Sequence, residues 1–309
     1  MKNYKYPHIL IASLAQCLFF LFPMSGNTGF LWILVYLCPI PIMYIGIRYD
    51  WKHSALTAII SSLFVYYADY KLAIFNGLVF CIPSIYLCYL LMLNKLNPKT
   101  EERSWFPISL LITNILKLGM SLLILLIIYI GPGFEEYISR LSLFYSSAFE
   151  VRPDLEQIIN LSTMELIAYT LPVLFILFFI LIFIMNIWLS LKLTKANGHL
   201  RRPHPNFHNI NLPNAYIYYL LISLAGSFIG FGIIKVLCIT FSFGLLLCYS
   251  INGLSILHYV TIGMNLRPLI LVIVYTLIII FIPFIVPLTI LGILDYNNQM
   301  RYKINFNRR

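Results

Sequence analysis

The sequence predicts an all-α fold, a polytopic bundle of eight to ten helices that cross a membrane. Hydrophobic residues make up 61% of the 309 positions and charged residues only 10%, whereas soluble domains have about 25% charged residues. Long apolar runs recur along the chain, and the turn-formers and charges lie between them. Backbone groups inside a bilayer must bond to one another, so apolar runs of about 20 residues are expected to be helices.

Nine apolar runs are candidate spans. The first follows Lys2 and Lys5 and has no small-residue cleavage site after it, so we expect a retained helix there. The last contains Pro283 and Pro287, which break helices, and we expect a broken or re-entrant pair. The candidate spans are 8–23, 30–47, 53–68, 72–93, 106–130, 165–191, 214–231, 233–257 and 266–294.

Two further segments are expected to depart from simple spans. Pro39 and Pro41 should distort the second span, and such interrupted helices either mark binding sites in transporters or are tolerated for packing. The only long acidic connection is 131–164. Within it, 134–149 carries apolar residues at helical spacing, which predicts an amphipathic helix lying on the membrane surface.

Lysines and arginines are concentrated in alternate loops, which predicts a cytoplasmic amino terminus. With the amino terminus inside, nine spans would place the cationic tail after residue 300 outside. The concentration of basic residues on the cytoplasmic side instead predicts that this tail lies inside. The predicted number of spans is therefore eight to ten. The predicted inner loops hold Lys2, Lys5, Arg48, Lys52, Lys95, Lys99, Arg103, Lys192, Lys195, Arg201, Arg202 and Arg267. The predicted outer loops hold Lys71, Arg140, Arg152 and Lys235.

Sequence motifs for several kinds of chemistry are absent. There is no GxxxxGK[ST] or GxGxxG loop, no HExxH and no GxSxG. His199, His204 and His208 lie in an irregular basic loop, which favours a solvated loop over a metal site. We therefore expect no enzyme, no cofactor and no metal. The net charge is +10. The basic residues responsible for it lie in short loops between apolar runs, where they orient the helices in the membrane, so we expect no nucleic-acid partner.

Three residues are candidates for binding a substrate: Lys117, Asn114 and Asp69. Lys117 lies near the middle of 106–130, where a charge is costly and usually functional. It could pair with an anionic ligand, or instead with a neighbouring helix. Asn114 lies one turn before it. Asp69 lies with Lys71 at a predicted outer turn, where it either forms the rim of an outward-facing pocket or caps a hairpin.

Four segments carry a resemblance to a known family. They are Pro39-Ile40-Pro41 with Gly46-Ile47-Arg48, Leu212-Pro213, Asn252-Gly253-Leu254-Ser255-Ile256-Leu257-His258, and Gly292-Ile293-Leu294-Asp295. In this order they resemble the YybS-like family of uncharacterised bacterial multi-pass membrane proteins. The chain departs from the family's ending, because Tyr296-Asn297-Asn298-Gln299-Met300 intervenes between the aspartate and the first arginine.

The amino-terminal part of that family is similar to the substrate-binding subunits of energy-coupling-factor transporters. The resemblance implies a six-helix transporter-like membrane domain over 1–191, followed by a basic cytoplasmic loop over 192–213. A carboxy-terminal membrane domain with a cationic tail would then cover 214–309. It also implies the bacterial cytoplasmic membrane as the location.

The function that we expect is binding or transport of a small solute as a membrane component of an energy-coupled system. Its partners would be the lipid bilayer and a cytoplasmic ATPase or another membrane subunit. The alternative is a non-transporting membrane scaffold or assembly protein, which would hold partners through the basic loop and the cationic tail.

Overall fold

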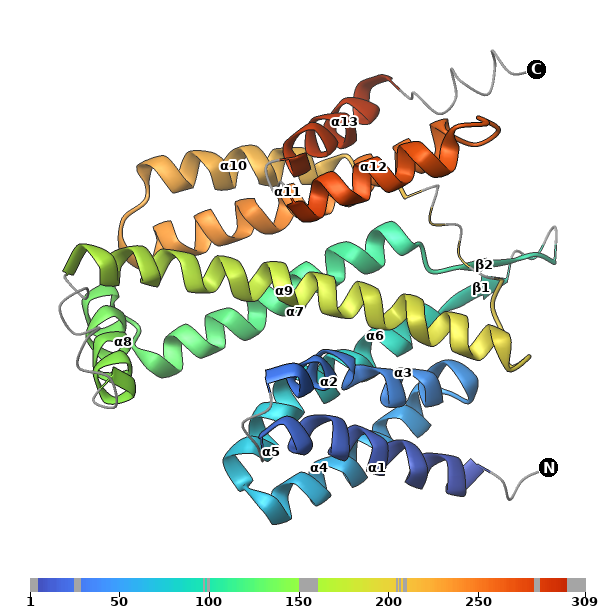
Figure 1. Cartoon of the computed structure of the whole chain (residues 1–309), viewed down its shortest axis with the longest axis horizontal. Coiled ribbons are helices and arrows are strands. Elements are labelled where there is room, and N and C mark those ends of the chain that lie inside the picture. Colours follow the sequence, from blue (N-terminus) through green and yellow to red (C-terminus); the bar gives the residue numbers. More distant parts are fainter. Residues whose placement is uncertain are drawn as a thin grey trace. The chain divides into compact units, whose positions relative to one another are not determined.

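The computed structural model describes residues 5–24, 29–96, 98, 101–149, 161–203, 205, 207, 210–280 and 284–298. In these ranges the elements are helices apart from one antiparallel hairpin, formed by β1 (Asn94–Leu96) and β2 (Arg103–Trp105) (Figure 1). The chain forms two compact units. Unit 1 comprises Met1–Leu118 and Phe179–Pro205, and unit 2 comprises Gly119–Phe178 and Asn206–Arg309.

Five helices of the described chain are long and apolar enough to cross a membrane. They are Lys5–Pro23, Tyr70–Met92, Ile108–Ile130, Thr163–Ala196 and Gly232–Val260. Four apolar helices are shorter, namely Ile33–Arg48, Ala215–Ile229, Arg267–Ile278 and Ile285–Asp295. The all-α membrane bundle is therefore confirmed at this level. The count of eight to ten spans stays a prediction.

Unit 1 is built around α4, which packs against α1, α3 and α6. Buried serines and threonines let these helices approach closely and bond their hydroxyls to helix carbonyls, as is usual in membrane bundles. Ser13 Oγ, for example, donates to Ile9 O at 2.8 Å and to Thr57 O of α4 at 3.1 Å. The elements of unit 1 are α1 (Lys5–Met24), η1 (Gly29–Trp32), α2 (Ile33–Leu37), α3 (Pro39–Arg48), α4 (Trp51–Ala68), α5 (Tyr70–Asn76), η2 (Gly77–Cys81), α6 (Ile82–Met92) and the hairpin.

The second predicted span departs from the α-helical hydrogen-bonding pattern at one residue, as expected from its prolines, although that residue keeps helical backbone angles. The residue between α2 and α3 is Cys38, whose backbone N–H donates to Val35 O at 3.2 Å, three residues back. Pro39 and Pro41 have no N–H group, so they cannot continue the bonding pattern of an α-helix. The interruption is thus a direct consequence of this pair.

Two helices, α7 (Ile108–Ile130) and α9 (Leu161–Ala196), contribute one part to each unit. The other helices of unit 2 are α8 (Phe134–Phe149), α10 (Ala215–Ile229), α11 (Gly232–Val260), α12 (Arg267–Ile280) and α13 (Ile285–Asn298). Within the predicted span 266–294, α12 ends at Ile280 and α13 begins at Ile285. Of the two prolines on which the predicted break rests, Pro283 lies outside the described residues and Pro287 lies inside α13, so the broken or re-entrant pair stays a prediction.

The helix predicted over 134–149 is present as α8 with these bounds. Tyr137 and Leu141 are buried on one side of it. On the exposed side, Arg140 forms an ion pair with Glu136 at 2.7 Å. The helix is therefore amphipathic, and its location on a membrane surface stays a prediction.

In unit 2, α11 and α13 cross closely at two glycines, Gly253 and Gly292. A Cβ atom at Gly253 would overlap the carbonyl oxygen of Leu288, and one at Gly292 would overlap the carbonyl oxygen of Tyr249. Asn252 Nδ2 donates to Gly292 O at 3.0 Å. Both obstructing atoms belong to backbone, so no side-chain rotation can make room.

We predict that Gly253→Ala destabilises the protein by about 1–3 kcal/mol, the usual cost of overpacking a close contact. The midpoint of thermal denaturation in detergent measures this effect. Gly133→Ala is the control, because a Cβ there would meet only the Glu136 side chain at 4.0 Å. Equal midpoints for the two variants would contradict the close crossing.

Candidate functional site

Asp69 acts as the amino-terminal cap of α5. Its Oδ1 accepts hydrogen bonds from the backbone N–H groups of Lys71 at 2.6 Å and Leu72 at 3.2 Å. A carboxylate in this position satisfies donors that the helix cannot. The side chain is exposed, so capping accounts for its position whether or not it also contacts a ligand.

Asn114 and Lys117 lie on α7 in unit 1. Asn114 Oδ1 accepts a hydrogen bond from Tyr86 of α6 at 3.2 Å, and its Nδ2 donates to Leu110 O at 2.7 Å. Lys117 is exposed, although its neighbour Leu116 is fully buried. The structure thus joins Asn114 to α6, whereas Asp69 is held by its own helix turn.

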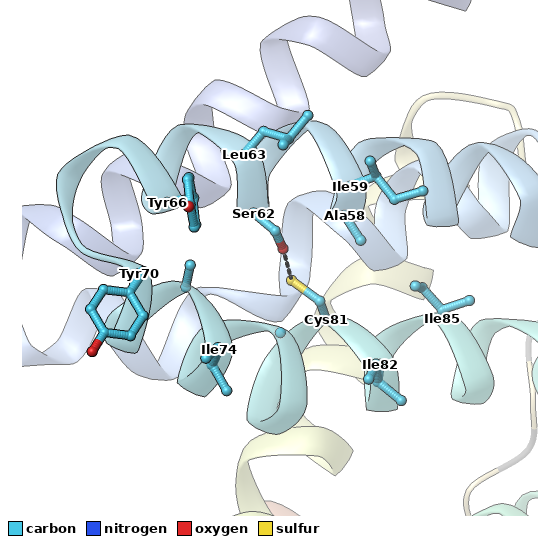
Figure 2. Close-up of a pocket in the computed structure, with 12 residues that line it drawn as sticks. Ala58, Ile59, Ser62, Leu63, Tyr66, Tyr70, Ile74, Cys81, Ile82 and Ile85 are labelled. Carbon is cyan, nitrogen blue, oxygen red and sulfur yellow. Dashed lines mark hydrogen bonds between the residues drawn. The ribbon is translucent and has the colours of Figure 1, made fainter.

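A groove of about 430 Å³ lies between α4 and the continuous segment α5–η2–α6 (Figure 2). Most of its lining is aliphatic, and Tyr66 and Tyr70 lie toward one end. Ser62 Oγ and Cys81 Sγ are 3.6 Å apart and join its two sides. The lining residues are Ala58, Ile59, Ser62, Leu63, Tyr66, Tyr70, Ala73, Ile74, Gly77, Cys81, Ile82 and Ile85.

The helix on one side of the groove contains a π-helical segment, η2. Such segments insert a residue into an α-helix and frequently occur at functional sites. The segment begins at Gly77, where an added Cβ would meet nothing within 4 Å. The glycine therefore leaves open space on the groove side of the helix.

A buried polar cluster consists of Gln16, Cys38 and Asn76, of which Asn76 directly precedes the π-helical segment. All three side chains are fully buried. Gln16 Nε2 lies 2.7 Å from Asn76 Oδ1 and 2.9 Å from Cys38 Sγ. Gln16 Oε1 and Asn76 Nδ2 have no hydrogen-bond partner in the described structure. The cluster therefore holds one unused acceptor and one unused donor.

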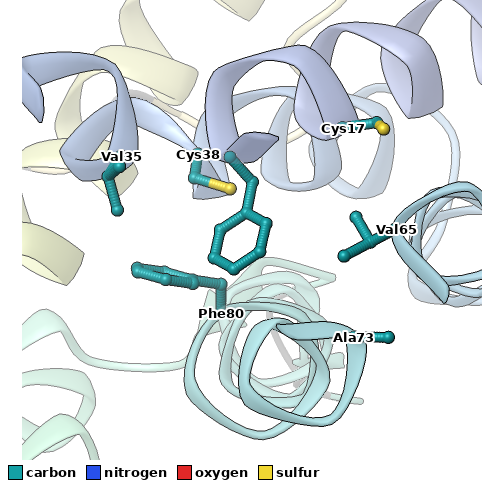
Figure 3. Packing of buried hydrophobic residues seen from close by; sticks show 7 residues of the cluster. Cys17, Val35, Cys38, Val65, Ala73 and Phe80 are labelled. Carbon is teal, nitrogen blue, oxygen red and sulfur yellow. The ribbon is translucent and has the colours of Figure 1, made fainter. Parts of the chain in front are cut away.

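Apolar side chains pack around Cys38, one member of the polar cluster (Figure 3). Phe20 and Phe80 make an edge-on ring contact, with centroids 6.1 Å apart. In such a low-dielectric surrounding, hydrogen bonds are stronger and unpaired polar groups are more costly than in water. Ala73 belongs both to this apolar shell and to the lining of the groove, so one helix connects the two features.

Sequence reasoning did not identify Gln16 and Asn76, which are 60 positions apart and each stand in an apolar run. The one feature of the sequence that pointed to this region was the pair Pro39 and Pro41, next to Cys38. Among the described residues, no group of three His, Cys, Asp or Glu side chains could hold a metal ion. His204 and His208 lie outside the described residues.

One family model matches the chain over residues 10–296, and the family is described as "Predicted membrane protein (DUF2232)". No curated protein and no solved structure matches. The likeness to the YybS-like family and to energy-coupling-factor subunits stays a prediction. Since the family model covers nearly the whole chain, the protein belongs to the DUF2232 family of predicted membrane proteins.

Proposed function

We propose that unit 1 binds a small, largely apolar solute in the groove between α4 and α5–η2–α6. Ligand pockets usually measure about 300–1,000 Å³ and combine apolar walls with a few polar groups. The groove, at about 430 Å³, has aliphatic walls and offers Ser62, Tyr66 and Tyr70 as polar contacts. Its chemistry suits a solute with little charge.

The observation that carries this proposal is the polar cluster beside the groove, at the place where two helices are irregular. The interruption at Cys38 and the π-helical segment after Asn76 both border it. Interrupted helices recur at the binding sites of transporters. A solute whose polar end reached the cluster would receive a donor from Asn76 and an acceptor from Gln16. Leaving such buried atoms unpaired costs about 1–3 kcal/mol each, so a ligand that pairs with them gains affinity.

The proposed role is that of a membrane component in an energy-coupled transport system. The chain has no nucleotide-binding motif, so movement of the solute against a gradient requires a separate ATPase.

Asp69 lies in the turn between the groove residues Tyr66 and Tyr70. It stays a proposed contact at the rim of the groove, together with Asn114 and Lys117 on α7.

Filling the groove should abolish retention of the solute. Gly77→Leu adds a side chain where a Cβ meets open space, so we predict an intact fold and loss of the bound molecule. The protein is purified from native membrane, then denatured, and the released small molecules are identified by mass spectrometry.

Gly29→Leu is the matched control, because a Cβ at Gly29 also meets nothing within 4 Å and Gly29 does not line the groove. The control should retain the solute as the wild type does. If wild-type protein released only membrane lipid, the solute proposal would be wrong and the scaffold alternative would be favoured.

A second prediction separates a binding role of the amides from a structural one. In the double variant Gln16→Met with Asn76→Leu, both partners become apolar groups of similar size, a change that can be nearly neutral for stability. We predict that the free energy of unfolding of this variant stays within about 1 kcal/mol of the wild-type value, as judged from the denaturation midpoint. The amount of retained solute should fall at least tenfold. Full retention in this variant would show that the amides serve packing alone.

Lys117 is tested separately by Lys117→Ala. If its ammonium group contacts the solute, retention should fall while the denaturation midpoint stays close to that of the wild type, because the side chain is exposed. Retention equal to that of the wild type would remove Lys117 from the proposed contacts.

A further inference from the structure

Arg202 is a buried cation at the end of unit 1. It is only 7% exposed, whereas the preceding Arg201 is exposed. Its Nη1 donates to Leu91 O at 2.7 Å, and its Nε has no hydrogen-bond partner. No carboxylate in the described chain forms an ion pair with it. Burial lowers the pKa of Arg202 to about 10, so the guanidinium still carries its charge at neutral pH.

Two neighbours stabilise this charge in part. Leu91 lies in the last turn of α6, where the helix dipole favours a cation. The guanidinium carbon lies 5.7 Å from the centre of the Trp105 ring, a cation–π distance. Buried charges are normally paired with an opposite charge. These two contacts compensate the charge of Arg202 only in part, so an anion close to it would be stabilised.

The hairpin of β1 and β2 leads from α6 to α7 (Figure 1). A pocket of about 320 Å³ is lined by residues at the base of this hairpin. Trp105 lines it and is therefore shared between the pocket and Arg202. Lys95, Asn94 and Ser104 make one part of the lining polar, with Ser104 Oγ fixed on Lys95 O at 3.0 Å. Leu93, Phe106 and Pro107 make the remainder apolar.

We propose that this pocket binds the phosphate of an anionic phospholipid headgroup. Lys95 supplies the direct positive contact, and Arg202 adds a second positive charge behind the Trp105 ring. The apolar part of the lining suits the glycerol and upper acyl region of a lipid, which free phosphate lacks. Basic pockets at the cytoplasmic ends of membrane helices are known to take such headgroups.

The electrostatic surroundings agree with this assignment. The hairpin and the loop that carries Arg202 both belong to the side predicted to face the cytoplasm, where anionic lipids attract basic segments. The acids of the hairpin, Glu101 and Glu102, are exposed at its far end and do not line the pocket. Tryptophan is typical of the membrane interface, and Trp105 therefore suits a pocket that takes a lipid headgroup.

The test is lipid retention by the full chain in detergent, read by native mass spectrometry after incubation with phosphatidylglycerol or phosphatidylcholine. We expect the wild type to retain phosphatidylglycerol in preference. Lys95→Gln and Arg202→Gln should each lower that preference about fivefold, the effect of about one basic group near a membrane surface. Arg201→Gln is the matched control, because it removes the same charge from the adjacent exposed position and should leave the preference unchanged.

An equal loss in all three variants would overturn the proposal, since net charge alone would then explain retention. No loss in Lys95→Gln would also overturn it, and this exposed position keeps the test valid if Arg202→Gln fails to fold. In a parallel arm, inorganic phosphate is added to the lipid-loaded protein. Displacement of phosphatidylglycerol by millimolar phosphate would assign the pocket to a soluble phosphate and overturn the lipid assignment.

Discussion

The structure depends on one constraint, which is that a backbone inside lipid must satisfy its hydrogen bonds within the protein. Long apolar runs meet it by forming α-helices. Where a helix departs from the α pattern, polar groups become available to other partners. In the described part of unit 1, such places include Cys38 and Gly77–Cys81. The buried amides of Gln16 and Asn76 lie beside them, which is why this region is the best candidate for binding.

The same constraint gives small residues their role in packing. Hydrophobic burial drives helices together only weakly in lipid, so close backbone contact becomes important. Gly253 and Gly292 provide it between α11 and α13. Both belong to segments that resemble the YybS-like family, and a third such segment follows Ile210, whose N–H donates to Ser255 Oγ of α11 at 3.2 Å. These three segments therefore contribute to the packing of unit 2, or directly adjoin residues that do.

The sequence predicted the positions of helices well, because apolar length and turn-forming residues act locally. The helix over 134–149 followed from the spacing of its apolar residues, whereas Pro283, one of the prolines behind the break predicted within 266–294, lies outside the described residues. The polar cluster could not be predicted in this way, since its members are 22 and 60 positions apart along the chain. Likewise, nothing in the sequence distinguishes Arg202 from Arg201. Only the tertiary fold buries one of them and exposes the other.

The two proposed sites differ in the charge of the ligand that they can accept. The side chains packed with Cys38 are aromatic and aliphatic, and a charged ligand beside Cys38 and its partner Gln16 would lose its hydration without gaining a counter-ion. Neutral amide groups compensate a neutral polar group well, but they compensate a full charge poorly. At the hairpin, the exposed Lys95 provides positive charge close to water, and the buried Arg202 adds a second charge beside Trp105. A neutral solute in the bundle and an anionic headgroup at its end are therefore compatible, because neither ligand suits the other's site.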